Sequence, residues 1–207
     1  MVRTLGIIMI FLAASWSAGA TAGEKKVTRE IAVLQTSLGS IEIELLRGDA
    51  PKTVENFVKL AQKKTFNGIR FHRVSRGFVI QTGDPLSADP KNKEKWGTGG
   101  TSVYGGKEFA DELNPGTQSY KDGYKRGVVA MANRGPNTNT SQFFIMLVDR
   151  AEMPKLYTIF GRVVSGMEVV DKIGSVELDP PYASDGKPKT DVMLLKASVK
   201  KQGESKK

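Results

Sequence analysis

Residues 71–84 have the sequence FHRVSRGFVIQTGD, and residues 131–144 have the sequence MANRGPNTNTSQFF. In and beside these stretches lie short runs rich in β-branched and aromatic residues: Ile69–Val74, Phe78–Thr82, Val128–Ala132 and Phe143–Leu147. Such runs, separated by glycine, proline and asparagine, are typical of β-strands joined by turns. The two stretches therefore predict a β-rich fold.

The segments before and after these stretches continue the strand pattern. Ile31–Thr36 and Ile41–Leu46 flank a turn at Gly39, and the second run alternates apolar with acidic residues, which predicts a β-hairpin. Tyr157–Val164 and Val192–Val199 have the same strand-like composition. Together the runs predict about eight strands.

Only two segments have the apolar spacing of a helix. In one, Asp49 is a candidate N-cap, Pro51 stands in the first turn, and apolar residues recur at helical spacing from Val54 to Ala61. The other is Met167–Ile173. Because strands do not alternate with helices, the sheet is predicted to be antiparallel. A sheet of this size avoids free edges by closing into a barrel.

The composition fits one domain and excludes several kinds of chemistry. The 207 residues include no cysteine and one histidine, which excludes disulfides, thiol nucleophiles and a His/Cys metal site. The net charge is +9, but the lysines are dispersed, and the densest clusters lie at Lys63–Lys64, Lys91–Lys95 and Lys200–Lys207. We interpret most of this charge as solvated surface.

The N-terminal residues have the pattern of an export signal. Arg3 precedes an apolar run at Leu5–Ala14, and Ala18-Gly19-Ala20 has the small-x-small form of a cleavage site. The run is too short to cross a bilayer of about 30 Å as a helix, so we expect cleavage and no stable membrane insertion afterwards; a retained anchor is the alternative. The expected segments are a signal peptide at 1–20, a polar linker at 21–28, a folded domain at 29–200 and a disordered basic tail at 201–207. We expect a periplasmic or secreted protein, with a secretory lumen as the alternative.

The two stretches quoted above resemble a family signature when a third segment is added. This segment contains Gly97–Gly100, Tyr104-Gly105 and Phe109–Glu112. In order and spacing, the three resemble the cyclophilin-type peptidyl-prolyl cis/trans isomerases, from about Arg29 to Lys200. The resemblance implies a closed eight-stranded antiparallel β-barrel capped by two α-helices, with a proline-binding groove on its outer wall.

The resemblance also implies which residues form the site. Arg73 matches the catalytic arginine, Gln81 is a second catalytic position that helps to hold the substrate chain, and Gln142 supports the groove. The proline pocket and the positions that hold the substrate chain are implied to be Phe78, Val79, Ala132, Asn133, Phe144, Leu156 and Tyr157.

The chemistry of prolyl isomerisation accounts for these residue types. Rotation about a peptide bond must overcome the loss of amide resonance, a barrier of roughly 18–20 kcal/mol. No covalent bond breaks, so we expect no cofactor, no metal and no nucleophile. An apolar pocket can hold the proline ring while a fixed donor, for which the guanidinium of Arg73 is well suited, stabilises the twisted amide.

Other functions use parts of the same pattern. A proline-binding module without turnover would use the same groove, although an intact Arg73 favours an enzyme. A basic nucleic-acid-binding barrel would need aromatic stacking residues on a basic groove, and the sequence has no such pattern. His72 has no serine and acid at a convincing spacing for a hydrolase triad, and Gly97–Gly100 is not followed by the Lys-Ser/Thr of a phosphate loop.

The expected partners are proline-containing polypeptides, which the protein would bind during the folding of exported proteins. We expect no binding of nucleic acid, and we expect a monomer.

Two departures from the family affect which ligands are expected to bind. Residues 151–157 lack the tryptophan whose indole helps to hold cyclosporin in eukaryotic cytosolic members, so weak cyclosporin binding is expected. Arg134 replaces a small residue and is expected to narrow or charge the rim of the groove.

Overall fold

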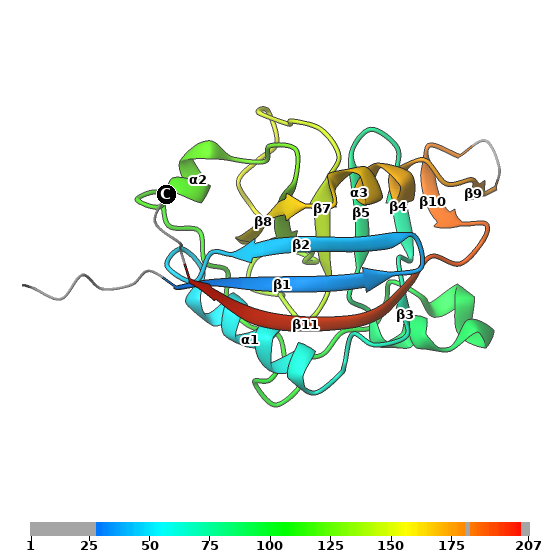
Figure 1. Ribbon diagram of the computed structural model, residues 1–207, viewed down its shortest axis with the longest axis horizontal. Helices are drawn as coiled ribbons and strands as arrows, with labels where there is room; N and C mark the ends of the chain where they lie inside the picture. The colour runs from blue at the N-terminus through cyan, green and yellow to red at the C-terminus, as the bar shows by residue number, and fades with distance from the viewer. Residues whose placement is uncertain (1–27, 181–182, 204–207) are drawn as a thin grey trace, which may run out of the picture.

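The computed structural model describes residues 28–180 and 183–203 (Figure 1). The strands are β1 (Thr28–Thr36), β2 (Gly39–Leu45), β3 (Ile69–Arg70), β4 (Arg73–Ser75), β5 (Val79–Thr82), β6 (Val128–Met131), β7 (Phe143–Met146), β8 (Ile159–Ser165), β9 (Leu178–Asp179), β10 (Asp185–Pro188) and β11 (Met193–Gly203). The helices are α1 (Pro51–Gln62), α2 (Gln118–Asp122) and α3 (Met167–Gly174), with 3-10 turns η1 (Pro85–Ala88) and η2 (Pro90–Lys95).

The strands form one curled sheet, in which every pair is antiparallel. Its order is β3-β11-β1-β2-β8-β6-β7-β5-β4-β10-β9. The register shifts between Gln35 and Thr36, between Glu42 and Ile43, and between Val129 and Ala130. Register irregularities of this kind increase the local twist, which helps the sheet to curl.

The predicted closed barrel of eight strands is not confirmed. The sheet has eleven strands among the described residues, and its order is open, with β3 at one end and β9 at the other. The chain itself bridges part of this opening, because only Phe71 and His72 separate β3 from β4, which lies near the opposite end. Both edge strands are two residues long, and short edges offer few unpaired backbone groups.

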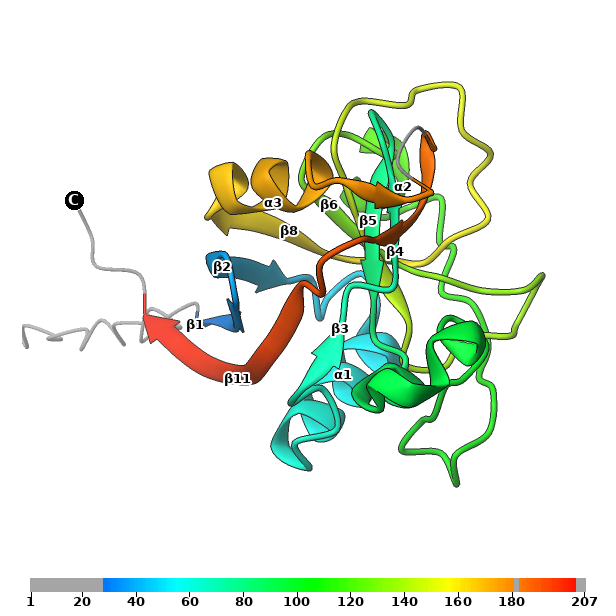
Figure 2. The same cartoon turned by 90° about the vertical axis from the view of Figure 1, so that its right-hand side faces the viewer.

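The two predicted helices are present, and α2 is an additional helix of five residues. In Figures 1 and 2, α1 lies below and α3 above the long strands β1, β2 and β11. Asp49 is not the N-cap of α1: the cap position is Ala50, and Asp49 instead accepts a hydrogen bond from the Ser119 amide. The Glu112 carboxylate accepts hydrogen bonds from the backbone N–H groups of Lys52 and Thr53 at 3.0 and 2.8 Å. It thus caps the N-terminus of α1 from a distant part of the chain, which the local sequence does not predict.

Strand β7 separates two apolar clusters. All four of its residues are buried, which is unusual for a strand with alternating faces. Phe143 points into the main core, where it meets Phe57 of α1 edge-on at a centroid distance of 5.6 Å. Phe144 points to the other face and packs in a second cluster with Val79 and Ile159. This outer cluster is the structural basis of the site described below.

The domain is longer than the predicted 29–200. Strand β11 continues to Gly203 and pairs with β1 from Thr28, so residues 201–203, expected in a disordered tail, belong to the sheet. Backbone pairing compensates for their polar side chains. The predicted signal peptide lies outside the described residues. No helix among the described residues is long and apolar enough to cross a membrane.

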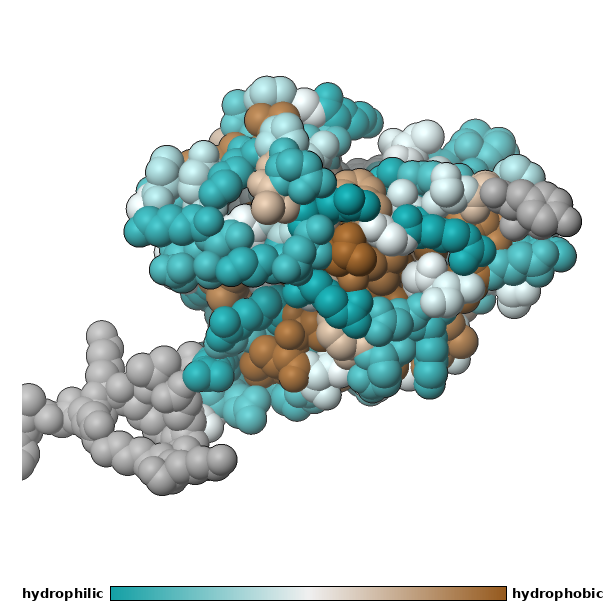
Figure 3. Space-filling view, turned by 90° about the horizontal axis from the view of Figure 1, so that it is seen from above, coloured by the Kyte–Doolittle hydropathy of each residue, from teal (hydrophilic) through white to brown (hydrophobic). Residues whose placement is uncertain are grey.

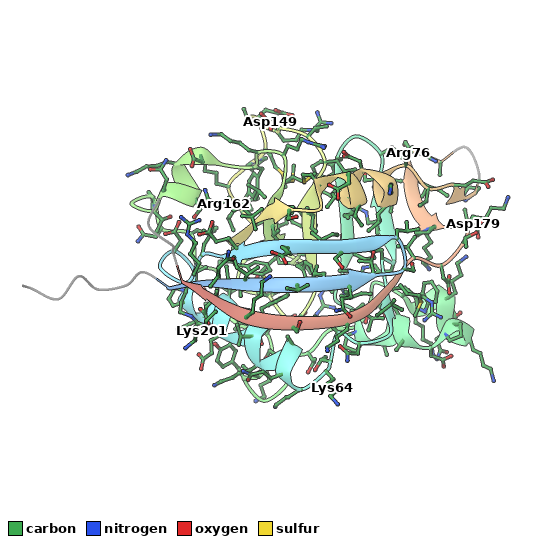
Figure 4. The ribbon with its side chains drawn as sticks, viewed as in Figure 1. Lys64, Arg76, Asp149, Arg162, Asp179 and Lys201 are labelled. Atoms are coloured by element: carbon green, nitrogen blue, oxygen red, sulfur yellow. The ribbon has the colours of Figure 1, made fainter. Side chains whose placement is uncertain are left out.

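Charged side chains are spread around the domain. In Figure 4, Lys64, Arg76, Arg162 and Lys201 lie on different sides of the ribbon. Seen from above, in Figure 3, hydrophobic residues appear as small areas between hydrophilic ones.

Candidate active site

A cleft of about 720 Å³ lies over one face of strands β4 and β5 and is walled by loops. Half of the predicted site residues line it: Arg73, Gln81, Ala132, Asn133 and Gln142. The loops contribute backbone and small polar groups from residues 97–100, 106–108, 134, 138 and 140.

Strand register brings the polar and apolar parts of the site together. Arg73 on β4 is the direct partner of Gln81 on β5, Gln81 is the partner of Phe144 on β7, and Phe144 is the partner of Ala130 on β6. Side chains of directly opposed residues lie on one face, with Cβ atoms about 4.5–5.5 Å apart. The guanidinium and the aromatic ring are therefore two strands apart in one cross-strand row.

Arg73 is held by two side chains. Its Nε and Nη2 donate to the two carboxylate oxygens of Asp185 at 2.9 and 2.5 Å, and its Nη1 donates to Gln81 at 3.2 Å. The bond from Arg73 holds the pKa of the Asp185 carboxyl below its usual range, so this carboxyl is ionised at neutral pH. The guanidinium is thus fixed at the edge of the cleft.

A chain of amides continues from Arg73 into the protein. Gln81 Nε2 donates to Gln142 Oε1 at 2.9 Å, and the Gln142 amide donates to the carbonyls of Gly97 and Gly99 at 2.9 and 2.6 Å. These bonds tie strands β4 and β5 to the glycine-rich wall of the cleft. The Gln142 side chain therefore joins Gln81 on β5 to this wall.

His72 ends this chain of hydrogen bonds. Its ring is 3% exposed, and its Nε2 lies 3.1 Å from Gln142 Oε1, an acceptor, so Nε2 carries the proton. Burial lowers the pKa of His72 to about 4, which leaves the ring neutral at pH 7. Its Nδ1 is buried without a hydrogen-bond partner. The interpretation of His72 as a structural residue agrees with this placement.

The glycine-rich wall is anchored by Asp84. This carboxylate is fully buried and accepts the amides of Leu86, Gly97 and Gly99 at 2.8, 2.6 and 3.3 Å. A Cβ on Gly99 would lie 2.3 Å from the Asp84 carboxylate, so the close approach requires glycine there. The loop at 85–99 thus folds back on the cleft around one carboxylate.

The outer apolar cluster contains four of the residues predicted for the proline pocket. Phe78, Val79, Phe144 and Tyr157 all belong to the outer cluster, and Phe144 meets Tyr157 edge-on at 5.5 Å. Met153 also packs against this cluster. The Tyr124 hydroxyl fixes the Tyr157 backbone by donating to its carbonyl and accepting from its amide, both at 2.9 Å.

Leu156 does not join the apolar cluster. Its side chain is 54% exposed, and its carbonyl accepts a hydrogen bond from the Asn133 side chain at 2.9 Å. The structure thus brings Met153 to the pocket wall, where the sequence interpretation had placed Leu156.

The rim of the cleft carries a second arginine. Arg134 Nη2 lies 2.7 Å from Glu108 Oε1, and the Arg134 side chain is 71% exposed. Lys107 and Glu108 line the same cleft from the opposite loop. Arg134 places a positive charge on the rim, as expected, and the ion pair with Glu108 balances this charge.

Asp185 was missed by the sequence interpretation. It lies 112 positions from Arg73, in a polar stretch with no local motif, and only the pairing of β10 with β4 places it there. Among the described residues, no cluster of three His, Cys, Asp or Glu side chains could hold a metal ion.

The sequence identifies the class of protein that this fold and site define. Residues 31–199 match the family described as cyclophilin type peptidyl-prolyl cis-trans isomerase/CLD. The chain therefore belongs to the cyclophilin-type peptidyl-prolyl cis/trans isomerases.

Individual relatives agree with this assignment. Peptidyl-prolyl cis-trans isomerase-like 1 of Rhizopus delemar is 47% identical over 73% of this chain and 84% of its own length. The human protein of the same name is 42% identical over 79% of this chain and 89% of its own. A crystal structure of a Cryptosporidium parvum cyclophilin, also solved in the presence of the dipeptide Ala-Pro, covers 83% of this chain and 98% of its own with a TM-score of 0.71 and 30% identity.

Proposed function

We propose that this isomerase uses Arg73 to stabilise the twisted amide of an X-Pro bond whose proline ring sits in the outer apolar cluster. The observation that carries the proposal is the cross-strand row, which places the guanidinium two strands from Phe144 on the same face. Phe78, Met153 and Tyr157 are half-buried members of the same cluster, and Val79 is buried within it.

The mechanism follows from differential binding. In the planar amide the prolyl nitrogen shares its lone pair with the carbonyl, and twisting returns that pair to the nitrogen. A charged, fixed donor binds the lone pair more strongly in the twisted state, which lowers the barrier in both directions. Gln81 accepts one N–H of the donor, and the apolar cluster holds the ring while the preceding carbonyl turns.

The direct test is two-dimensional NMR exchange on a short Ala-Pro peptide with wild type and Arg73→Ala. Loss of one preorganised donor is expected to reduce kcat/KM by about 10²-fold or more. Peptide binding, measured by chemical-shift titration, should remain, because the apolar cluster is intact. Wild type that binds the peptide without accelerating its exchange would instead identify a proline-binding module.

We also propose that the substrates are exported polypeptides, met in the periplasm or outside the cell. The support is the pattern of Arg3, Leu5–Ala14 and Ala18-Gly19-Ala20. Expression of the full chain in a bacterial host, followed by cell fractionation and mass spectrometry of the N-terminus, tests this. The expected product begins at Thr21 in the exported fraction; an intact N-terminus in the cytoplasm would contradict it.

A further inference from the structure

Arg73 is held from both sides by residues of different strands. Gln81 on β5 holds Nη1, and Asp185 on β10 holds Nε and Nη2. Asp185 pairs with Ser75, two residues beyond Arg73 on β4, so Asp185 and Arg73 are diagonal neighbours on one face of the sheet. The contact is therefore fixed by strand register and does not depend on a loop.

The pattern of bonds determines which donors stay available. An arginine side chain has five N–H groups in a planar fork. Asp185 uses two of them and Gln81 uses a third, which leaves one N–H on Nη1 and one on Nη2. Arg73 and Gln81 line the cleft, whereas Asp185 is not among its lining residues. The carboxylate thus holds the guanidinium from outside the substrate site.

The bond to Gln81 would not fix the guanidinium by itself. It is a single contact of 3.2 Å to a neutral acceptor, and the Arg73 side chain is 39% exposed. A two-point contact between arginine and carboxylate fixes both the plane and the rotation of the guanidinium. A mobile donor would spend less time in the geometry that favours the twisted amide.

We propose that Asp185 is a positioning residue for isomerisation, whose carboxylate orients the Arg73 guanidinium so that its two remaining N–H groups serve the prolyl amide. This inference rests on the proposed role of Arg73. It gives β10 (Asp185–Pro188) a role in the reaction, although no residue of this strand belongs to the outer apolar cluster.

The test is to measure kcat and KM separately, by NMR exchange at increasing peptide concentration, for Asp185→Ala, Asp185→Asn and Asp185→Glu. We expect kcat to fall about 10-fold in Asp185→Ala and Asp185→Asn, because neither retains a two-point acceptor, with KM within twofold of wild type. Asp185→Glu retains the charge and both oxygens and should recover a substantial part of the loss.

Two further measurements separate positioning from general damage. The Arg73 Nε–H signal in ¹⁵N spectra should exchange with water faster in Asp185→Ala than in wild type. Asp171→Ala is the matched control: it removes the partner of Arg126 in another exposed pair, at 2.7 Å, and should leave kcat unchanged. Similar melting temperatures for all variants would exclude unfolding as the cause.

The outcomes distinguish this inference from the proposed function. If Arg73→Ala retains full activity, the proposed role of Arg73 fails, and Asp185 has nothing to position. If Arg73→Ala is inactive while Asp185→Ala keeps wild-type kcat, the inference about Asp185 alone is wrong. A fall in kcat without faster exchange at Arg73 Nε–H would also overturn it, since the guanidinium would then have stayed in place.

Discussion

Two arginines border the same cleft, and they differ in position, hydrogen bonding and exposure. Arg73 lies on β4, forms three hydrogen bonds to two side chains and is 39% exposed. Arg134 lies in the loop after β6, forms one ion pair with Glu108 and is 71% exposed. Both side chains carry the same charge. Charge alone therefore does not distinguish Arg73, which we propose for catalysis, from Arg134 on the rim.

The two arginines differ in the hydrogen bonds that support each side chain. Behind Arg73, hydrogen bonds run through Gln81 and Gln142 to a buried histidine and to two backbone carbonyls. The ion pair between Arg134 and Glu108 is exposed to solvent, and dissolved salt screens it. A donor can stabilise a transition state only if it does not have to reorganise, which favours the buried network over the rim.

The largest expected effect is the contrast between Arg73→Lys and Arg134→Lys. Lysine at position 73 is a strongly hydrated point charge that cannot contact Asp185 and Gln81 through a planar fork. We expect kcat/KM to fall about 10²-fold in Arg73→Lys and to stay within about twofold in Arg134→Lys, measured by NMR exchange on an Ala-Pro peptide. Equal losses in both variants would show that the cleft responds to charge and not to geometry.

The buried side of the network should also respond to pH. Below pH 6.5 the unfolded chain protonates its histidine, whereas burial keeps folded His72 neutral down to a pKa of about 4. Stability is therefore full above pH 6.5 and is lost as the pH falls toward 4, by about 2 kcal/mol between pH 7 and pH 5.

Urea unfolding of wild type and His72→Gln at pH 7 and pH 5 measures this loss. The variant has no titrating ring, so its stability should change less over the same range. The charged neighbours Asp84 and Arg73 are present in both proteins and cancel in the comparison. An identical pH dependence in the two proteins would mean that His72 is not held neutral.

A smaller effect is expected for the link between Arg73 and the network. Gln81→Leu removes one acceptor of the guanidinium and one donor to Gln142, and it leaves the bonds to Asp185 in place. We expect kcat/KM to fall about 10-fold, less than in Arg73→Lys, with cis/trans exchange again as the readout. Activity as low as that of Arg73→Lys would place Gln81 itself in contact with the substrate.

Local pattern was sufficient for most of the strands, including the runs that contain Arg73, Gln81 and Phe144. Strand periodicity does not single these three residues out as a site, and their roles were predicted from the resemblance of residues 71–84 and 131–144 to the cyclophilin signature. Contacts that depend on distant segments could not be predicted. Asp185 reaches Arg73 across 112 positions, and Glu112 caps α1 from 59 and 60 positions away.

The remaining errors have the same origin. The open order of the sheet depends on β3, which is the start of the predicted run Ile69–Val74, and on β9 and β10. The sequences of β9 and β10 have little strand character, and their pairing is decided by their neighbours. The polar composition of residues 201–203 is typical of a disordered tail. These residues nevertheless extend β11 and pair with β1, which is already held in the hairpin with β2. Met153 and Leu156 are both apolar, and only the fold of their loop decides which one packs against the pocket.

The smallest expected effect is that of Arg134→Ala, which tests the rim side of the comparison. An exposed pair such as Arg134–Glu108 contributes less than about 0.5 kcal/mol to stability, and salt weakens it further. We therefore expect unchanged urea unfolding and unchanged turnover of a neutral Ala-Pro peptide. Peptides with an acidic residue before the X-Pro pair should lose affinity modestly, and this loss should disappear in high salt, because it reflects screened attraction to the rim. A large, salt-independent loss with the neutral peptide would mean that Arg134 contacts the reacting amide, and the distinction between the two arginines would be wrong.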